Sequence, residues 1–297
     1  MKLGQIFEEK KLVYSLEIFP PKADSPIEKV YDTIDELSRI NPDYISVTYG
    51  AGGSIQDNRT FLLSSYTKNQ HNIDALAHLT CIGATRENID NILDELKAKN
   101  VENVLALRGD IPSTATDFKL GDFNNSQELI RHIKERGDFG IAAGCYPEGH
   151  PETKVKDKDI EILKYKEEAG ADLFITQLFY DNNYFYEFLN KVEQKGIKVP
   201  IEAGVMPVIN KKQIERTIQL SGAKLPGKFI KIINKYEHDK IALRDAGIAF
   251  AIEQIVDLIS SGVRGIHLYT MNNPYIANTI TDSVKSIVES INREQVI

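Results

Sequence analysis

The sequence has no tryptophan, three methionines and only two cysteines among its 297 residues. Two cysteines, Cys81 and Cys145, are too few for a disulfide scaffold, so a reducing cytoplasm is the expected compartment. They form no Cys-x-x-Cys pair, and no His-Glu-x-x-His stretch occurs. A metal site is therefore not expected. A Gly-x-Ser-x-Gly nucleophile elbow is also absent, which excludes the hydrolase signature that depends on it.

Long apolar runs and excess positive charge are also lacking. No run approaches 18 apolar residues, and the first residues, MKLGQIFEEKK, lack the apolar core of a signal peptide. We therefore expect neither a membrane span nor a secretory leader. The formal net charge of −7 argues against nucleic-acid binding, which usually needs a basic surface. A hydrophobic content of 42% is ordinary for a globular protein.

What the sequence does contain is a regular alternation of β-rich runs and amphipathic helical segments. This pattern predicts an α/β protein with parallel strands near residues 13–18, 44–49, 76–82, 103–108, 140–146, 173–179, 200–206 and 264–270. Eight such units fit a (β/α)₈ TIM barrel, formed as a single domain over residues 1–297. Extra helices around residues 226–261 would lie between strands seven and eight. A doubly wound open sheet is the alternative fold.

Polar residues follow or end each predicted strand, where a barrel of this type carries its chemistry. Candidate functional residues of this kind are Glu17, Thr48, Tyr49, His78, Arg108, Asp110, Tyr146, His150, Gln177 and Tyr269. Each also has a structural interpretation. Glu17 could form a buried ion pair, and His78 could be a hydrogen-bonded core histidine.

Two further patterns have both a functional and a structural interpretation. The stretch GAGGSI, residues 50–55, approaches a dinucleotide fingerprint but has Ile55 at the third glycine position, so close approach of a ligand to the backbone is the preferred interpretation. Asp159 and Lys166 lie two helical turns apart and share one face. They could contact ribose hydroxyls and a phosphate, although a solvated helix surface is the preferred interpretation of this pattern on its own.

Eight segments then converge on a known family. In order they are SLEIFPPK, ISVTYGAGGS, AHLTCIGAT, LALRGDIP, CYPEGHPE, ITQLFYD, GVMPV and HLYTMN. Together they closely resemble the methylenetetrahydrofolate reductase family in its bacterial, catalytic-barrel form. The resemblance implies a TIM barrel with non-covalent FAD that takes a hydride from NADH or NADPH. The reduced flavin then converts 5,10-methylenetetrahydrofolate to 5-methyltetrahydrofolate in one-carbon metabolism and methionine supply. A homo-oligomer is expected from the same resemblance.

The resemblance also implies roles for individual residues. Glu17 matches the general acid, and apolar surroundings are expected to raise its pKa. Asp110 matches an aspartate near both flavin and folate. Gln177, Gln213 and Tyr269 match substrate-binding positions. Flavin-binding positions map to Thr48, Tyr49, His78, Arg108, Gly109, Asp110, Ser126, Tyr146, His150, Asp159 and Lys166.

The sequence departs from the family pattern at four positions. Asn273 replaces an arginine, Thr217 an aromatic residue, and Tyr165 and Ile162 polar residues on the flavin side. Two other functions therefore stay open: a flavin-free barrel transferase or lyase that binds a pterin or folate, and a catalytically silent binding protein. The presence of both Glu17 and Asp110 favours the enzyme, because binding alone needs no general acid.

Overall fold

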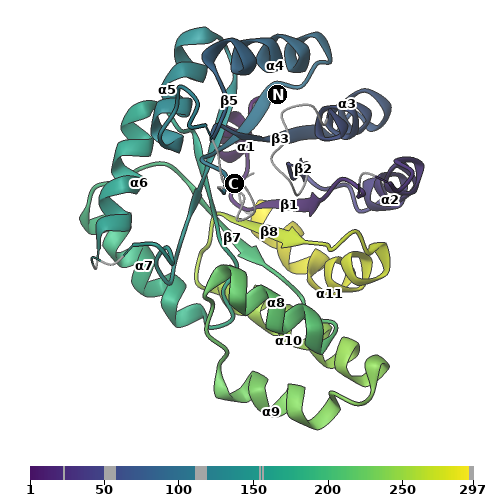
Figure 1. Cartoon of the computed structure of the whole chain (residues 1–297). Helices are drawn as coiled ribbons and strands as arrows, with labels where there is room; N and C mark the ends of the chain where they lie inside the picture. Colours follow the sequence, from purple (N-terminus) through teal and green to yellow (C-terminus); the bar gives the residue numbers. More distant parts are fainter. Residues whose placement is uncertain (23, 50–57, 111–118, 154, 156, 294–297) are drawn as a thin grey trace.

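The computed structural model describes residues 1–297 except 23, 50–57, 111–118, 154, 156 and 294–297. Its strands are β1 (Val13–Ile18), β2 (Tyr44–Val47), β3 (Asp74–Thr80), β4 (Asn103–Leu107), β5 (Gly140–Cys145), β6 (Leu173–Thr176), β7 (Ile201–Val205) and β8 (Gly265–Tyr269). All pair in parallel and in chain order, and β8 returns to pair with β1 (Figure 1). The predicted (β/α)₈ barrel is confirmed, and its closure excludes the open doubly wound sheet.

Only β1 has the predicted bounds, and β4, β5, β7 and β8 differ from theirs by one residue at one or both ends. The larger differences are that β2 ends at Val47 and β6 at Thr176, earlier than predicted, while β3 runs from Asp74 to Thr80 instead of 76–82. After β6, the Gln177 amide still donates to the Cys145 carbonyl of β5 at 2.7 Å, while the Gln177 side chain accepts a hydrogen bond from the Leu178 amide at 3.0 Å. The polar ends that the sequence places within strands therefore belong to the loops at the barrel mouth.

Helices cover the outside of the barrel (Figure 1). They are α1 (Leu3–Glu9), α2 (Glu28–Ser38), α3 (Arg59–His71), α4 (Arg86–Ala98), α5 (Ser126–Arg136), α6 (Lys158–Ala169), α7 (Asn182–Gln194), α8 (Lys211–Ser221), α9 (Gly227–Tyr236), α10 (Lys240–Ser260) and α11 (Pro274–Arg293). α9 and α10 are the extra helices predicted between β7 and β8. No helix among the described residues is long and apolar enough to span a membrane.

Local sequence explains where the helices near the site begin and end. The Asn125 side chain accepts a hydrogen bond from the Glu128 amide and caps the start of α5. Gly170 ends α6 with a φ of +113°, a conformation that disfavours residues with a Cβ atom. The predicted stop signal at Gly170 is confirmed. These two residues fix where α5 begins and where α6 ends.

α1 closes the bottom of the barrel, which the sequence pattern did not indicate. Its apolar side chains Leu3, Ile6 and Phe7 belong to one buried cluster with inward-facing strand residues, including Val13 and Leu76. The larger apolar cluster lies between the strands and the outer helices. Apolar packing is therefore supplied at the base and around the outside of the sheet.

The interior nearer the mouth is polar instead. Ser15, Ser46, His78, Glu202 and His267 are all buried there on alternating positions of their strands. A barrel interior is usually filled by bulky branched apolar residues, and buried polar groups cost free energy unless they find partners. This polar layer therefore marks the end of the barrel where function is expected.

Candidate active site

Two adjoining cavities lie at the carboxyl ends of the strands. The larger, of about 470 Å³, extends from β4 and β5 to α5 and α6. The smaller, of about 190 Å³, lies over the barrel interior and is lined by residues of β1, β3 to β6 and β8, or just after them. The two share the lining residues Leu107, Gly144, Cys145 and Tyr146. A molecule in the larger cavity can therefore meet a second molecule in the smaller one.

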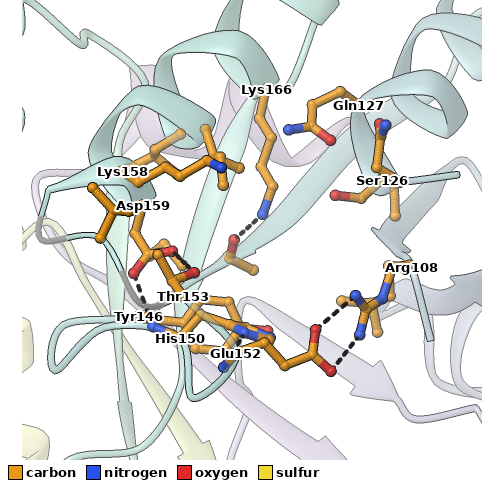
Figure 2. A pocket seen from close by; sticks show the side chains of 18 of the residues that line it. Arg108, Ser126, Gln127, Tyr146, His150, Glu152, Thr153, Lys158, Asp159 and Lys166 are labelled. Carbon is orange, nitrogen blue, oxygen red and sulfur yellow. Dashed lines mark hydrogen bonds and ion pairs between the residues drawn. The ribbon is translucent and has the colours of Figure 1, made fainter. Parts of the chain in front are cut away.

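The larger cavity brings together six of the residues that the sequence singled out (Figure 2). They are Arg108, Ser126, Tyr146, His150, Asp159 and Lys166. They come from the ends of β4 and β5 and from α5 and α6, so only the fold makes them neighbours. Ile162, a departure from the family pattern, also lines this cavity, whereas Tyr165 is exposed.

Asp159 orders the loop that follows β5. One carboxylate oxygen accepts a hydrogen bond from the His150 amide at 2.9 Å, and the other accepts one from the Thr153 hydroxyl at 2.8 Å. The His150 ring packs edge-on against Tyr146 with 4.6 Å between ring centroids. Asp159 thus holds in place two aromatic residues of the cavity wall, in addition to facing the cavity itself.

Lys166 is a buried cation in the same wall. Its side chain is only 8% exposed, and its ammonium donates a hydrogen bond to the Gly144 carbonyl at 2.7 Å. Burial lowers the pKa of Lys166, although nearby Cys145 and Asp159 act in the opposite direction. The shared face of Asp159 and Lys166 is therefore a cavity wall, and the alternative of a solvated surface is wrong.

Arg108 is held by an ion pair at the cavity mouth. Its guanidinium donates to both carboxylate oxygens of Glu152, at 2.8 and 3.1 Å. This pairing raises the pKa of Arg108 and lowers that of Glu152. The next residue, Gly109, has a φ of +85°, and a Cβ there would lie 2.9 Å from the Ile82 side chain. Only glycine fits this turn without strain.

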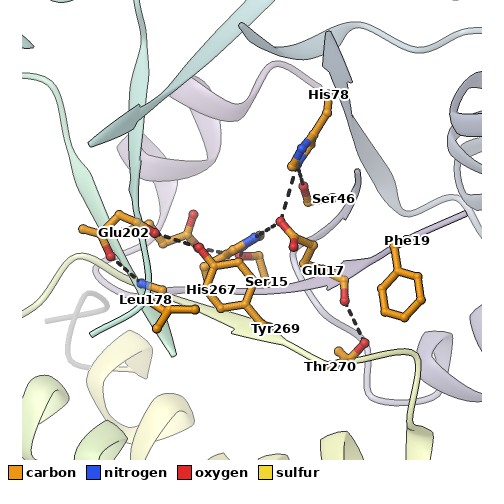
Figure 3. Close-up of polar contacts among 12 residues, drawn as sticks. Ser15, Glu17, Phe19, Ser46, His78, Leu178, Glu202, His267, Tyr269 and Thr270 are labelled. Atoms are coloured by element: carbon orange, nitrogen blue, oxygen red, sulfur yellow. Dashed lines mark hydrogen bonds and ion pairs between the residues drawn. The ribbon is translucent and has the colours of Figure 1, made fainter. Parts of the chain in front are cut away.

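The smaller cavity is lined by Glu17, His78, Gln177 and Tyr269, all predicted site residues. Glu17 is 17% exposed, and one of its carboxylate oxygens lies 3.4 Å from His267 Nε2 and 3.5 Å from His78 Nε2 (Figure 3). Burial lowers the pKa of His78 to about 4, so this imidazole is neutral at pH 7.

The apolar surroundings expected for Glu17 are not found. Its sequence neighbours Leu16 and Ile18 point to the opposite face of β1 and belong to the outer apolar cluster. The side chains that approach the carboxyl group are two imidazoles. The reason is the period of a strand, because adjacent residues face opposite sides of the sheet.

Five predicted site residues are not among the described residues that line either cavity: Thr48, Tyr49, Gly109, Asp110 and Gln213. Asp110 is exposed on the rim after β4. The Gln213 side chain accepts a hydrogen bond from the Ile209 amide at 3.0 Å and so closes the start of α8. The glycine-rich stretch at 50–55 lies outside the described residues.

Two departures from the family pattern also have local contacts. The Thr217 hydroxyl lies 3.8 Å from the sulfur of Met206. The Asn273 side chain accepts a hydrogen bond from the Ile276 amide at 3.3 Å, at the start of α11. Asn273 therefore has a capping role that an arginine could not fill, because arginine has no acceptor atom.

Sequence reasoning missed four residues beside Glu17: Ser15, Tyr44, Glu202 and His267. All are buried, and hydrogen bonds connect them (Figure 3). A signal was present, because IEAGV carries an acid within an apolar strand, as SLEIF does. The residue two positions before Glu17 also faces the same side of β1. The sequence of a single strand does not predict which hydrogen-bond partner Ser15 or Glu202 contacts.

Several known proteins are similar to this chain in sequence or in fold. A sequence profile described as methylenetetrahydrofolate reductase matches residues 2–285. Methylenetetrahydrofolate reductase (NADH) 1 of Arabidopsis thaliana is 35% identical over 284 residues, covering 91% of this chain and 48% of that protein. The 5,10-methylenetetrahydrofolate reductases of Pectobacterium carotovorum subsp. carotovorum and Escherichia coli K12 are 32% and 31% identical. Each covers 90% of this chain and 88% of the bacterial protein.

The chain thus spans about half the length of the plant relatives and most of the bacterial ones. Among solved structures, an uncharacterized protein from Clostridium thermocellum that binds two copies of 5-methyl-5,6,7,8-tetrahydrofolic acid superposes with a TM-score of 0.66. It is 13% identical and covers 97% of this chain and 100% of its own, which supports the fold alone. The profile match and the bacterial alignments show that this chain belongs to the methylenetetrahydrofolate reductase family.

Proposed function

We propose that this protein reduces 5,10-methylenetetrahydrofolate to 5-methyltetrahydrofolate, using NADH or NADPH and bound FAD. The observation that carries the proposal is the pair of adjoining cavities: Glu17 faces the smaller, and six of the predicted flavin-binding residues line the larger. NADH appears in the name of the Arabidopsis relative, which supports that nucleotide as the first to test.

The larger cavity has the chemistry that FAD needs. Its volume lies within the usual range for sites that bind cofactors. Apolar side chains such as Leu107 and Phe188 suit a flavin ring, while Lys158 and Lys166 supply positive charge for a diphosphate. Asp159 has the acceptor atoms for ribose hydroxyls. FAD, when bound, supplies the carrier that moves a hydride from the nicotinamide to the folate.

Glu17 is proposed as the general acid. Its carboxyl group would protonate a nitrogen of the bridged folate, so that the five-membered ring opens to a cation ready to accept the hydride. His78 is neutral at pH 7, so it does not neutralise the Glu17 carboxylate with a full positive charge. Gln177 and Tyr269 would orient the pterin from the far wall of the same cavity. Asp110, on the rim, would accept pterin N–H bonds.

The first test separates this function from a flavin-free barrel enzyme and from a silent binding protein. Purified protein should show a flavin absorption spectrum, either as isolated or after FAD is added. NADH or NADPH should bleach it, and methylenetetrahydrofolate should restore it. A protein that binds no flavin would contradict the proposal. One that binds flavin but passes no hydride to folate would be a binding protein.

A second test concerns Glu17 alone. In Glu17→Gln, the amide cannot donate an acidic proton, so reduction of flavin by NADH should persist while reoxidation by the folate is lost. We expect the folate half-reaction to slow by about 10²-fold or more. Stopped-flow absorbance of the flavin measures both steps. Equal losses in both half-reactions would mean that Glu17 supports the site structurally and is not the acid.

A further inference from the structure

Behind Glu17 lies a second carboxyl group that the proposed reaction does not use. Glu202, on β7, has no exposed surface. Its two oxygens accept hydrogen bonds from the Ser15 hydroxyl, at 2.7 Å, and from the Tyr44 hydroxyl. The facing position on β8 is Gly265, where a Cβ would lie 2.6 Å from the Glu202 side chain. The fold thus leaves room for this acid and supplies both of its donors.

A continuous chain of polar contacts joins Glu202 to Glu17 (Figure 3). Ser15 Oγ lies 2.7 Å from Glu202 and 2.6 Å from His267 Nδ1. The opposite nitrogen of the same ring, Nε2, lies 3.4 Å from Glu17. Ser15 and His267 have no exposed surface. Water is therefore kept from the middle of the chain, and its only open end is Glu17 at the cavity.

In this series of contacts, the direction of one hydrogen bond fixes the direction of the next. The Ser15 hydroxyl has a single proton, so when it donates to Glu202 it can only accept from His267. His267 then carries its proton on Nδ1 and presents a bare Nε2 to Glu17. A bare nitrogen accepts a hydrogen bond, and so it favours the protonated form of the Glu17 carboxyl group. A negative charge on Glu202 is thereby linked to a proton on Glu17.

We propose that Glu202 is a positioning residue that shares one proton with Glu17 through Ser15 and His267 and keeps Glu17 in its acid form. This inference rests on the proposed function, since it gives Glu17 its role as acid. No oxidation or reduction is involved. In the second arrangement the Glu17 proton moves to Nε2, the Nδ1 proton to Ser15 and the Ser15 proton to Glu202. His267 is neutral in both arrangements.

The groups around Glu202 act on its pKa in opposite directions. Burial raises the pKa of Glu202, while His267 and the hydrogen bonds from Tyr44 and Ser15 oppose that rise. The nearby Asp43 carboxylate adds to the rise in the pKa of Glu202. Around Glu17, the titratable neighbours are His78, His267 and Tyr269, and burial keeps both His78 and Tyr269 neutral at pH 7. Glu202 is thus the remote acid that Glu17 can exchange with.

The decisive variant is Glu202→Gln, which keeps the shape but removes the charge and the exchangeable proton. Loss of a linked negative charge should lower the apparent pKa of the folate half-reaction by about one unit, and slow that step about tenfold at pH 8. Reduction of the flavin by NADH should be unchanged. An unaltered pH profile, or an equal loss in both half-reactions, would overturn the proposal. Glu148→Gln is the matched control, because Glu148 does not line the smaller cavity.

A second readout does not need catalysis. In ¹⁵N-histidine NMR of the resting protein, His267 should show the Nδ1–H tautomer, and Ser15→Ala should convert it to a mixture. A wild-type Nε2–H signal, or one that Ser15→Ala leaves unchanged, would refute the link. If the protein fails to reduce methylenetetrahydrofolate but the tautomer responds as expected, the proposed function fails while the coupling of these four residues stands.

Discussion

At the scale of single residues, Lys166 is a buried cation whose burial makes the stability of the protein depend on pH. Its ammonium donates a hydrogen bond to the neutral Gly144 carbonyl. Because burial lowers its pKa from 10.5, the folded protein releases this proton at a lower pH than the unfolded chain does. The free energy of unfolding should therefore rise as pH increases from the lowered value toward 10.5.

Lys166→Met should remove that pH-dependent rise in the free energy of unfolding. The same variant should weaken FAD binding about tenfold and leave riboflavin binding nearly unchanged, because riboflavin has no diphosphate. Urea unfolding at several pH values and flavin fluorescence titrations measure the two effects. Lys164→Met is the control, since Lys164 pairs with Glu167 and does not line the cavity. Equal losses for FAD and riboflavin would show that Lys166 does not contact the diphosphate.

At the scale of elements, α1 is separate from the chemistry although it belongs to the barrel core. Its Leu3 amide donates to the Asn103 side chain at 2.9 Å, at the start of β4 and so at the end of the barrel opposite the cavities. Phe7 is buried in the lower apolar cluster. α1 should therefore contribute to stability and not to flavin binding.

Phe7→Ala should lower the free energy of unfolding by about 3 kcal/mol, because it leaves a cavity in packed apolar surroundings. FAD affinity should stay within about twofold of wild type. The neighbouring residue Glu8 is exposed, so Glu8→Ala serves as the control and should change little. A loss of flavin binding in Phe7→Ala at temperatures where the protein remains folded would contradict this separation.

At the scale of the whole molecule, the helices inserted between β7 and β8 pack closely on the barrel. α10 approaches the loop after β7 at Gly247, where a Cβ would lie 1.7 Å from the Val208 carbonyl oxygen. Val208 also belongs to a separate, smaller apolar cluster that includes Phe229 of α9. The inserted helix α10 therefore packs against the loop after β7 so closely that no side chain fits at Gly247.

Gly247→Ala should destabilise the protein by about 2 kcal/mol, because α10 must shift away from the loop. Gly227→Ala is the paired control: an added Cβ meets nothing within 4 Å there, and the residue begins α9. That change should be neutral or slightly stabilising, since alanine narrows the unfolded ensemble. Thermal unfolding of the two variants measures the difference, and similar melting temperatures would show that α10 adapts without cost.

The sequence alone predicted most of the strands and helices and several of the candidate site residues. Alternating β-rich and helical segments gave the eight strands and the extra helices, because the period of side chains along each segment is a local property. The same pattern placed Glu17, His78, Arg108 and Tyr146 at strand ends, where a parallel barrel gathers them. α1 escaped prediction because seven residues carry too little pattern to distinguish a helix from a loop.

Only the tertiary structure decided which polar residues meet. The helix pattern alone favoured a surface position for Lys166, but its ammonium is buried and donates to the Gly144 carbonyl of β5. Glu202 was not singled out at all, because its donors come from the distant strands β1 and β2. Ser15 and Glu202 are 187 positions apart in the chain, and their contact depends on barrel closure and strand register. The sequence determined which groups could act as acids, bases and cations. The closed sheet decided which of them face one another, because hydrogen bonds act only over a few ångströms.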